Sequence, residues 1–191
     1  MAVAGIDMLN LDARLLTIGE GRFLPLDFGQ LLVAEQAALL RLAQRLVWDS
    51  EEARDLVQAT FADAFERRAQ LRDGAAARSW LQRILVHRAM TLLRRRKLWG
   101  AVRGLFLLDE ADPSATPDRS LEATQEQRKL ARVLRALPAQ QSTAFTLRYL
   151  TGLSLDEVAA AMEIGRGTVR THLYRALCEL RANGVLTEEQ P

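Results

Sequence analysis

Residues 137–181 read LPAQQSTAFTLRYLTGLSLDEVAAAMEIGRGTVRTHLYRALCELR, and this stretch decides the fold. Ser154 stands three residues before Glu157, the S-x-x-E pattern of a helix start in which both side chains cap backbone N–H groups. Gly165 and Gly167 then interrupt the apolar periodicity. A new apolar stripe with helical spacing follows at Val169, Leu173, Leu177 and Leu180. The stretch therefore predicts a helix, a turn, a short helix, a tight turn and a final helix.

The final helix of this stretch has a polar and basic outer face. Opposite its apolar stripe stand Arg170, Thr171, His172, Tyr174 and Arg175. A short helix, a tight turn and a helix with such a face form the layout of a DNA-reading helix-turn-helix. An ordinary helical hairpin with a solvated outer face has the same local pattern, so the motif needs support from the rest of the chain.

Length and composition favour an all-helical protein. A chain of 191 residues allows one or two domains, and a hydrophobic content of 49% allows a packed core in each. Aromatic residues are few, alanine, leucine and arginine are abundant, and runs of β-branched residues are missing. We find no signal peptide and no apolar run long enough to cross a membrane. The expected location is therefore the cytoplasm, without membrane insertion.

Charge is strongly segregated along the chain, although the formal net charge is only +2. Between residues 67 and 103 a single acid, Asp73, faces the basic residues Arg67, Arg68, Arg72, Arg78, Arg83, Arg88, Arg94, Arg95, Arg96, Lys97 and Arg103. Between residues 109 and 126 the sign reverses, and only Arg119 faces the acids Asp109, Glu110, Asp112, Asp118, Glu122 and Glu126. A basic block followed by an acidic segment predicts a part that binds a polyanion and a solvated tether.

Helical periodicity divides the chain into two modules. It predicts helices over residues 27–47, 51–68 and 77–97, with Ser50 as the N-cap of the second, and helix again from near Leu121. Pro113 and Pro117 lie in the acidic segment, which is typical of a linker. The predicted fold is all-α, with two small helical domains joined by a flexible acidic linker. The expected parts are an N-terminal extension (1–26), a first domain (27–103), a linker (104–120), a second domain (121–183) and a tail (184–191).

Short motifs in both modules, taken in order, resemble one known family. In the first module these are DLVQATF at 55–61, WLQRI at 80–84 and LRRRK at 93–97. In the second they are LPAQQ at 137–141, LRYL at 147–150, GLS at 152–154 and GTVRTHL at 167–173. The chain resembles an extracytoplasmic-function sigma factor, a member of group IV of the sigma-70 family of bacterial transcription initiation factors. The match extends over about residues 28–181, and the linker matches only in character.

The resemblance implies three binding surfaces. The first domain would bind the β′ clamp of core RNA polymerase, and the second would contact the β flap. Residues implied at the polymerase surface are Asp55, Leu56, Gln58, Thr60 and Phe61. Residues implied at the −10 element, which the first domain would help to melt, are Arg72, Arg78, Arg83, His87, Arg88, Arg94, Arg95 and Arg96. Residues implied at the −35 element are Arg166, Thr168, Arg170, Thr171, His172, Tyr174 and Arg175.

Within the −35 set, base reading and phosphate binding are expected from different side chains. Arg170, Thr171 and Tyr174 are expected to read bases or methyl groups, and Arg166, His172 and Arg175 to bind phosphates. The resemblance also implies an anti-sigma factor that holds the protein inactive until a signal arrives. The N-terminal extension is a candidate contact for that partner.

Four residues depart from the family's common pattern. Ala59 stands where glutamate is common, His87 where asparagine is common, Thr91 where aspartate is common and Glu163 where glycine is common. Ala59 is expected to weaken one polymerase contact, and His87 and Thr91 to alter the −10 preference. Glu163 puts the geometry of the helix-turn-helix turn in question. Gly165 occupies the usual serine cap position, where glycine is a near-equal substitute.

Two other classes of protein are weighed against the sigma factor. The recognition-helix motif also fits a LuxR-type regulator, which binds duplex DNA as a dimer without melting it, but the first module does not fit that class. An enzyme is not expected, because His87 and His172 lack metal-ligand spacing and no nucleophile elbow or phosphate-binding glycine loop is present. No metal or cofactor is expected. The single cysteine, Cys178, is expected to be a buried, inert thiol.

Overall fold

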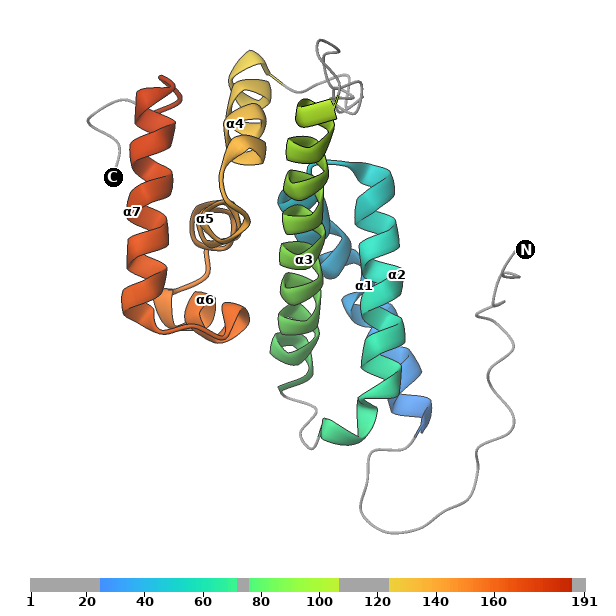
Figure 1. The fold of residues 1–191 in the computed structure, drawn as a ribbon. Coiled ribbons are helices and arrows are strands. Elements are labelled where there is room, and N and C mark those ends of the chain that lie inside the picture. The colour runs from blue at the N-terminus through green and yellow to red at the C-terminus, as the bar shows by residue number, and fades with distance from the viewer. Residues whose placement is uncertain (1–24, 72–75, 107–123, 187–191) are drawn as a thin grey trace.

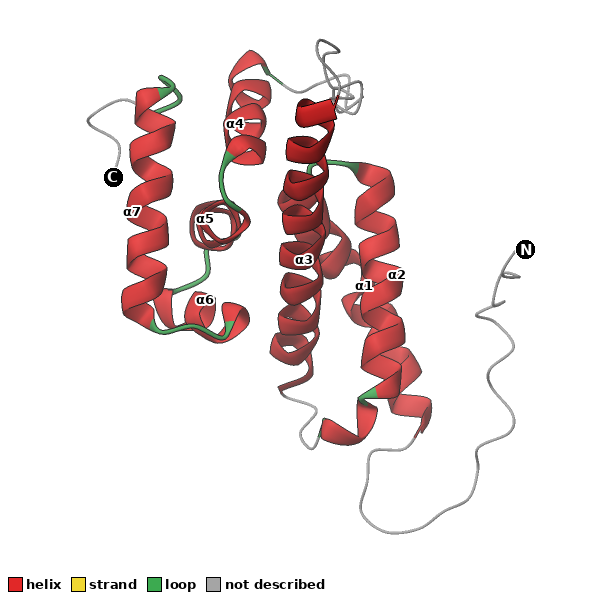
Figure 2. Ribbon diagram, viewed as in Figure 1, coloured by secondary structure: helices red, strands yellow, loops and turns green. Residues whose placement is uncertain are grey.

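The computed structural model describes residues 25–71, 76–106 and 124–186, and these ranges contain helices and no strand (Figures 1 and 2). The all-α prediction is confirmed. The predicted N-terminal extension up to residue 24, Arg72, the linker from residue 107 and the tail from residue 187 lie outside the described residues. The elements are α1 (Pro25–Val47), α2 (Ser50–Glu66), the 3-10 helix η1 (Arg68–Gln70), α3 (Ala77–Phe106), α4 (Gln125–Ala136), α5 (Ala139–Phe145), the π-helix η3 (Thr146–Leu150), α6 (Leu155–Met162) and α7 (Arg166–Ala182).

The long helix α3 lies at the centre of the molecule. Helices α1 and α2 pack on one side of it, and α5 and α6 pack on the other (Figure 1). We call α1–α3 the first module and α4–α7 the second module. Helix α3 continues to Phe106 and so runs past the predicted helix end at Lys97 and the predicted domain boundary at residue 103. Because α3 lies between these two groups of helices, each of its side chains faces α1 and α2, the second module or solvent.

The two modules share a hydrophobic core. Leu85 and Val86 of α3 are fully buried in one cluster with Leu147 and Val158 of the second module. A second, smaller cluster joins α4 to α7 through Leu134 and Leu180, and Trp48 from the first module packs against it. Since burying apolar surface is the main favourable term in folding, this shared core holds the modules together.

The helix caps of α2 and α4 differ slightly from the sequence prediction. Asp49, one residue before the expected Ser50, caps α2, and its Oδ1 accepts the backbone N–H groups of Glu51 and Glu52 at 2.9 and 2.8 Å. Trp48 directly before it has a left-handed backbone with φ of 58°, which turns the chain between α1 and α2. Helix α4 begins at Gln125 with a reciprocal cap between Thr124 and Gln127, whereas the predicted start near Leu121 lies outside the described residues.

The helix-turn-helix forms as the sequence predicts. Ser154 and Glu157 cap α6 reciprocally, and the hydrogen bond from the Ser154 backbone lowers the pKa of the Glu157 carboxyl. Glu163 ends α6 in the left-handed region, with φ of 53°, where glycine is the usual residue. A side chain there costs about 1–2 kcal/mol. The turn therefore has its ordinary geometry, and the cost of Glu163 is backbone strain.

Candidate nucleic-acid interface

Helix α7 presents a solvent-exposed face of the composition expected for reading DNA. Its buried side consists of Val169, Leu173, Ala176 and Leu180, so the core stripe includes Ala176, while Leu177 is only partly buried. The predicted contact residues Arg166, Thr168, Arg170, Thr171, Tyr174 and Arg175 are all exposed. Tyr174 keeps 68% of its surface in solvent. Such an exposed large aromatic side chain on one helix face is available for contact with a partner.

Two of the predicted phosphate contacts have restricted chemistry. His172 is half-buried, and its burial together with the charge of Arg175 lowers the pKa of the imidazole. His172 therefore stays neutral near pH 7, so it can donate a hydrogen bond but cannot supply the positive charge expected of it. Arg166 forms a surface ion pair with Asp156 at 3.1 Å. A phosphate that binds Arg166 must therefore compete with the Asp156 carboxylate.

The start of α7 is open to an anion. Gly165 is the N-cap and offers no side-chain hydrogen bond to the first turn. Backbone N–H groups of a first helical turn lack partners within the helix and carry the positive end of the helix dipole. Helix α7 can therefore hold a DNA phosphate at its N-terminus while its exposed side chains face the bases.

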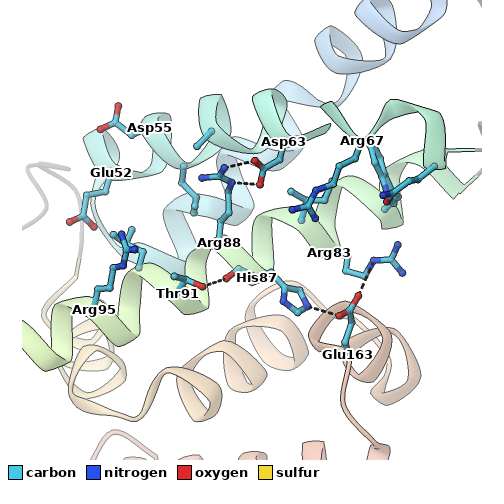
Figure 3. Close-up of a pocket in the computed structure, with 16 residues that line it drawn as sticks. Glu52, Asp55, Asp63, Arg67, Arg83, His87, Arg88, Thr91, Arg95 and Glu163 are labelled. Atoms are coloured by element: carbon cyan, nitrogen blue, oxygen red, sulfur yellow. Dashed lines mark hydrogen bonds and ion pairs between the residues drawn. The ribbon is translucent and has the colours of Figure 1, made fainter. Parts of the chain in front are cut away.

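Three of the predicted −10 arginines are paired with acids from other helices. Arg88 forms two hydrogen bonds to Asp63 of α2, at 2.6 and 2.5 Å, and Arg78 donates from Nε to Glu35 of α1 at 2.9 Å (Figure 3 for the first). Arg96 donates to Glu52 of α2 at 2.7 Å. Only one acid accompanies this basic block along the sequence, because the acids that pair with it lie on other helices. In the fold these three arginines fasten α3 to α1 and α2.

The basic groups left facing solvent form a smaller set. Arg94 and Arg95 are exposed, and Arg95 has no ion pair within the described part of the chain. Arg94 donates from Nε to the carbonyl of Met90 on its own helix at 3.2 Å. Arg83 and His87 both lie against Glu163 of the second module. Thr91 is exposed and its hydroxyl donates to the carbonyl of His87 at 3.0 Å.

The Asp63–Arg88 pair predicts a pH-dependent stability. The hydrogen bonds from Arg88 lower the pKa of the Asp63 carboxyl below its ordinary value of 3.8. A carboxyl with a lowered pKa in the folded state stabilises the protein above its ordinary pKa, and this contribution disappears as pH falls through the lowered value. Asp63→Asn is therefore expected to reduce the free energy of unfolding at pH 7 by about 1–2 kcal/mol, allowing for the partial exposure of Arg88.

Urea denaturation of the Asp63→Asn variant checks this expectation. The difference from the unsubstituted protein should shrink as the pH is lowered below 4. Asp55→Asn, an exposed acid on the same helix, serves as the control and should change the stability little at either pH. A difference between Asp63→Asn and the unsubstituted protein that stays constant down to pH 2 would contradict the electrostatic explanation.

The predicted polymerase surface on α2 divides into exposed and buried residues. Asp55 and Gln58 are exposed, and Phe61 is half-buried. Leu56 and Thr60 are buried, and the Thr60 hydroxyl donates to the Leu56 carbonyl at 2.7 Å. The last two side chains therefore pack α2 against the core and cannot reach a docked partner. Ala59 is half-buried between the two sets.

A groove separates α2 from α3. It has a volume of about 660 Å³, with the acids Asp55 and Asp63 on its α2 side and the arginines Arg88 and Arg95 on its α3 side (Figure 3). Glu163 from the second module lies at its edge, where it reaches Arg83 and His87. A second groove of about 400 Å³ lies at the start of α3 and is closed on one side by Leu153, Glu157 and Ala160 of the second module.

The expectation for Cys178 was wrong, because its thiol is exposed. The buried stripe of α7 includes Ala176 and Leu180, and a residue two positions after Ala176 points to the far side of a helix. Within the described residues no cluster of three or more histidine, cysteine or acidic side chains is placed to hold a metal ion. In the same part of the chain, no helix combines the length and the apolar character needed to span a bilayer.

Comparisons with known proteins assign both modules to one family. Residues 31–98 match the family model described as sigma-70 region 2, and residues 127–180 match the model described as sigma-70, region 4. The chain is similar to the RNA polymerase sigma-E factor of Streptomyces coelicolor, with 33% identity over 82% of this chain and 85% of that protein. It is also similar to the ECF RNA polymerase sigma-E factor of Salmonella typhimurium, with 32% identity over 78% of this chain and 82% of that protein.

A solved structure has a similar fold. The sigma factor RpoE of Bartonella quintana, solved in complex with the anti-sigma factor NepR, matches with a TM-score of 0.61 and 25% sequence identity. The match covers 85% of this chain and 99% of that one. The chain belongs to the sigma-70 family of RNA polymerase sigma factors and, within it, to the extracytoplasmic-function class. Proteins of this class bind DNA and initiate transcription, so the sigma-factor function expected from the sequence is confirmed.

Proposed function

We propose that the chain recruits core RNA polymerase through α2, reads a −35 element through α7 and holds an opened −10 element through α3, with no catalytic chemistry of its own. The observation that carries this assignment is the order of the two sigma-70 regions in one chain, each with an exposed surface of suitable chemistry. The catalytic site belongs to the polymerase, and the protein works in the cytoplasm, where its polymerase is.

The polymerase contact is assigned to the exposed side of α2. Asp55 and Gln58 project into solvent on this helix, and Phe61 is partly accessible beside them. We assign Leu56 and Thr60 to the packing that holds the helix in place, since both are buried. Exposed acids and amides on a rigid helix suit a docking surface whose partner supplies hydrogen-bond donors.

The −10 contact is assigned to Arg83, His87, Arg94 and Arg95. Arg78, Arg88 and Arg96 support α3 through Glu35, Asp63 and Glu52 and are reassigned from DNA binding to positioning. Arg94 and Arg95 are both exposed on α3, and each can neutralise a strand phosphate without breaking an ion pair within the described residues. Phosphate contacts of this kind are independent of sequence and depend strongly on salt.

Salt dependence separates these phosphate contacts from structural arginines. Replacing Arg94 and Arg95 together by Ala should weaken binding of a single strand and reduce the slope of log affinity against log salt by about 1.4, at 0.7 per lost phosphate contact. Arg41 and Arg54, exposed on α1 and α2, provide a double control that should leave the slope unchanged. Equal slopes for the two double variants, measured by fluorescence anisotropy in 50–300 mM salt, would remove Arg94 and Arg95 from the −10 contact.

Control by an anti-sigma factor is part of the proposal. The support is the class of the protein and the likeness to a sigma factor that was solved with its anti-sigma factor. Exposed apolar side chains such as Val33, Leu98 and Trp99 give such a partner places to bind besides the DNA and polymerase surfaces.

Run-off transcription tests the proposed function. Purified core RNA polymerase, this protein and a fragmented genomic template should together yield discrete transcripts that neither protein yields alone. Their start sites should share sequence elements near −35 and −10. Tight binding to duplex DNA without any such transcript would favour the LuxR-type regulator and overturn the proposal.

A further inference from the structure

The second module lies on the same part of α3 that is assigned to the −10 element. Glu163, at the tip of the helix-turn-helix, directs one carboxylate oxygen to Nε of Arg83 at 3.5 Å and the other to Nε2 of His87 at 3.3 Å (Figure 3). A carboxylate that meets an arginine and an imidazole in this way uses the two side chains that the proposed −10 contact would offer to a strand phosphate. The groove at the start of α3 is also closed by Ala160 of α6 and by Leu153, which precedes that helix.

Further contacts between the modules show that this arrangement is built into the fold. Three basic side chains each donate to a carbonyl at a helix end of the opposite module: Arg45 to Leu150, Lys97 to Ala136, and Arg135 to Trp48. Cationic groups are favourable at helix C-termini, where carbonyl groups lack partners. Together with the shared core, these contacts define a closed form of the chain.

The closed form cannot contact both promoter elements at once. Elements centred near −35 and −10 lie 25 base pairs apart, which is about 85 Å at 3.4 Å per base pair. Arg166 at the start of α7 is only three residues from Glu163, and three residues span at most about 11 Å. Since Glu163 touches Arg83, the −35 helix begins within roughly 25 Å of the −10 residues. Recognition of a promoter therefore requires the modules to separate.

We propose that Glu163 is an intramolecular latch, which holds the unbound chain closed and keeps Arg83 and His87 from promoter DNA until core RNA polymerase separates the modules. The inference rests on the proposed function for its account of what opens the latch. Asp55 and Gln58 remain exposed in the closed form, so polymerase can dock on α2 before the modules part. The strained backbone of Glu163 is consistent with a side chain retained for its contacts.

The latch is tested first on the protein without polymerase. The probe is a fluorescein-labelled single strand of 20 nucleotides with mixed sequence, and binding is followed by anisotropy. Glu163→Gln should bind the strand at least fivefold more tightly than the unsubstituted protein, and Glu163→Arg, which places a cation against Arg83, more tightly still. Glu179→Gln on α7 removes the same charge from an exposed position and should change the affinity less than twofold. Equal gains in strand affinity for Glu163→Gln and Glu179→Gln would show that the loss of one negative charge explains the effect, and this would overturn the latch.

Opening is measured directly by energy transfer between two dyes. One dye is attached to the exposed Cys178 of α7 and the other to Val33→Cys on α1, also exposed. Transfer should fall in the Glu163→Arg background and also when core polymerase is added to the chain with Glu163 intact. An energy-transfer efficiency that is unchanged by Glu163→Arg would overturn the latch. Transfer that responds to Glu163→Arg but not to polymerase would retain the latch and count against the proposed polymerase contact.

A covalent lock tests whether opening is required for transcription. Gln82 of α3 and Ala160 of α6 line the same groove, and neither is assigned to DNA or polymerase. Gln82→Cys and Ala160→Cys, in a Cys178→Ser background, can be joined by a reducible thiol crosslinker. The locked protein should support less than one tenth of the run-off transcription that the same sample supports after reduction. Equal transcription before and after reduction would show that the modules need not separate.

Discussion

Reversing the charge of Asp55 is expected to lower the affinity of the chain for core RNA polymerase by about 100-fold or more. Asp55 is exposed on α2 beside Gln58, on the surface assigned to polymerase docking. Asp55→Arg places a cation against the groups that an acid would contact, and a like-charge contact across an interface costs several kcal/mol. The variant should fold normally, because no ion pair to Asp55 is formed within the described residues.

Competition for core polymerase against a labelled sample of the unsubstituted chain measures this loss. Glu126→Arg makes the same charge reversal on α4, far along the chain from α2, and should compete almost normally. Circular dichroism and thermal unfolding establish that both variants are folded. An Asp55→Arg protein that competes as well as the Glu126→Arg control would move the polymerase contact away from α2.

Replacing Arg170 by Ala is expected to weaken binding to a −35 duplex by roughly 1–3 kcal/mol and to relax the sequence preference at one base pair. Arg170 lies on the exposed face of α7, one residue after the buried Val169, and the helix begins with open N–H groups that can fix its position on a phosphate. An arginine in the major groove can donate two hydrogen bonds to guanine, and this geometry distinguishes the four base pairs.

Arg175→Ala provides the comparison for Arg170→Ala. Arg175 is exposed one turn further along α7, and a phosphate contact there should weaken binding by a similar factor on every sequence. Anisotropy with the −35 duplex from a mapped promoter, and with single base-pair changes in it, distinguishes the two effects. Equal relaxation of sequence preference in both variants would contradict the separate roles of Arg170 and Arg175.

The helices were predictable because their signals are local. The reciprocal cap of Ser154 and Glu157, the glycine cap at Gly165 and the apolar spacing of α7 each depend on residues within one or two turns. The exposed face of α7 follows from the same periodicity. These features predicted the helix-turn-helix and the exposed face of α7, whereas the exposure of Cys178 was not expected.

The packing of the modules was not predictable from the sequence. Periodicity shows which face of α3 is polar but does not identify the acid that each arginine meets, and Glu35, Asp63 and Glu52 lie on other helices. The local charge count therefore overstated the basic surface available to DNA. Glu163 was recognised only as an unusual residue in a turn, because its partners lie on α3, far away in the sequence.

Burial within α2 was only partly predictable from the sequence. Thr60 is polar but satisfies its hydroxyl on the Leu56 carbonyl of its own helix, which permits full burial. Phe65 is apolar and lies one helical turn after Phe61, yet it remains 41% exposed with the Arg68 guanidinium 4.3 Å from its ring centre. A sequence pattern predicts burial from the polarity of each side chain. At Thr60 the burial depends instead on a local hydrogen bond, and at Phe65 the exposure is accompanied by a contact with an arginine.

Permanganate footprinting of one promoter mapped by run-off transcription tests the central claim most directly. Permanganate oxidises thymines that have lost their stacking and pairing, so it reports where a duplex has opened. With core polymerase and this chain together, reactive thymines should appear at the −10 element, and the −35 element should remain paired. Core polymerase alone, the chain alone and the Asp55→Arg chain with polymerase should each leave the −10 thymines unreactive. Opening of the −10 element by core polymerase without this chain, or its absence when both are present on a transcribed template, would contradict the account.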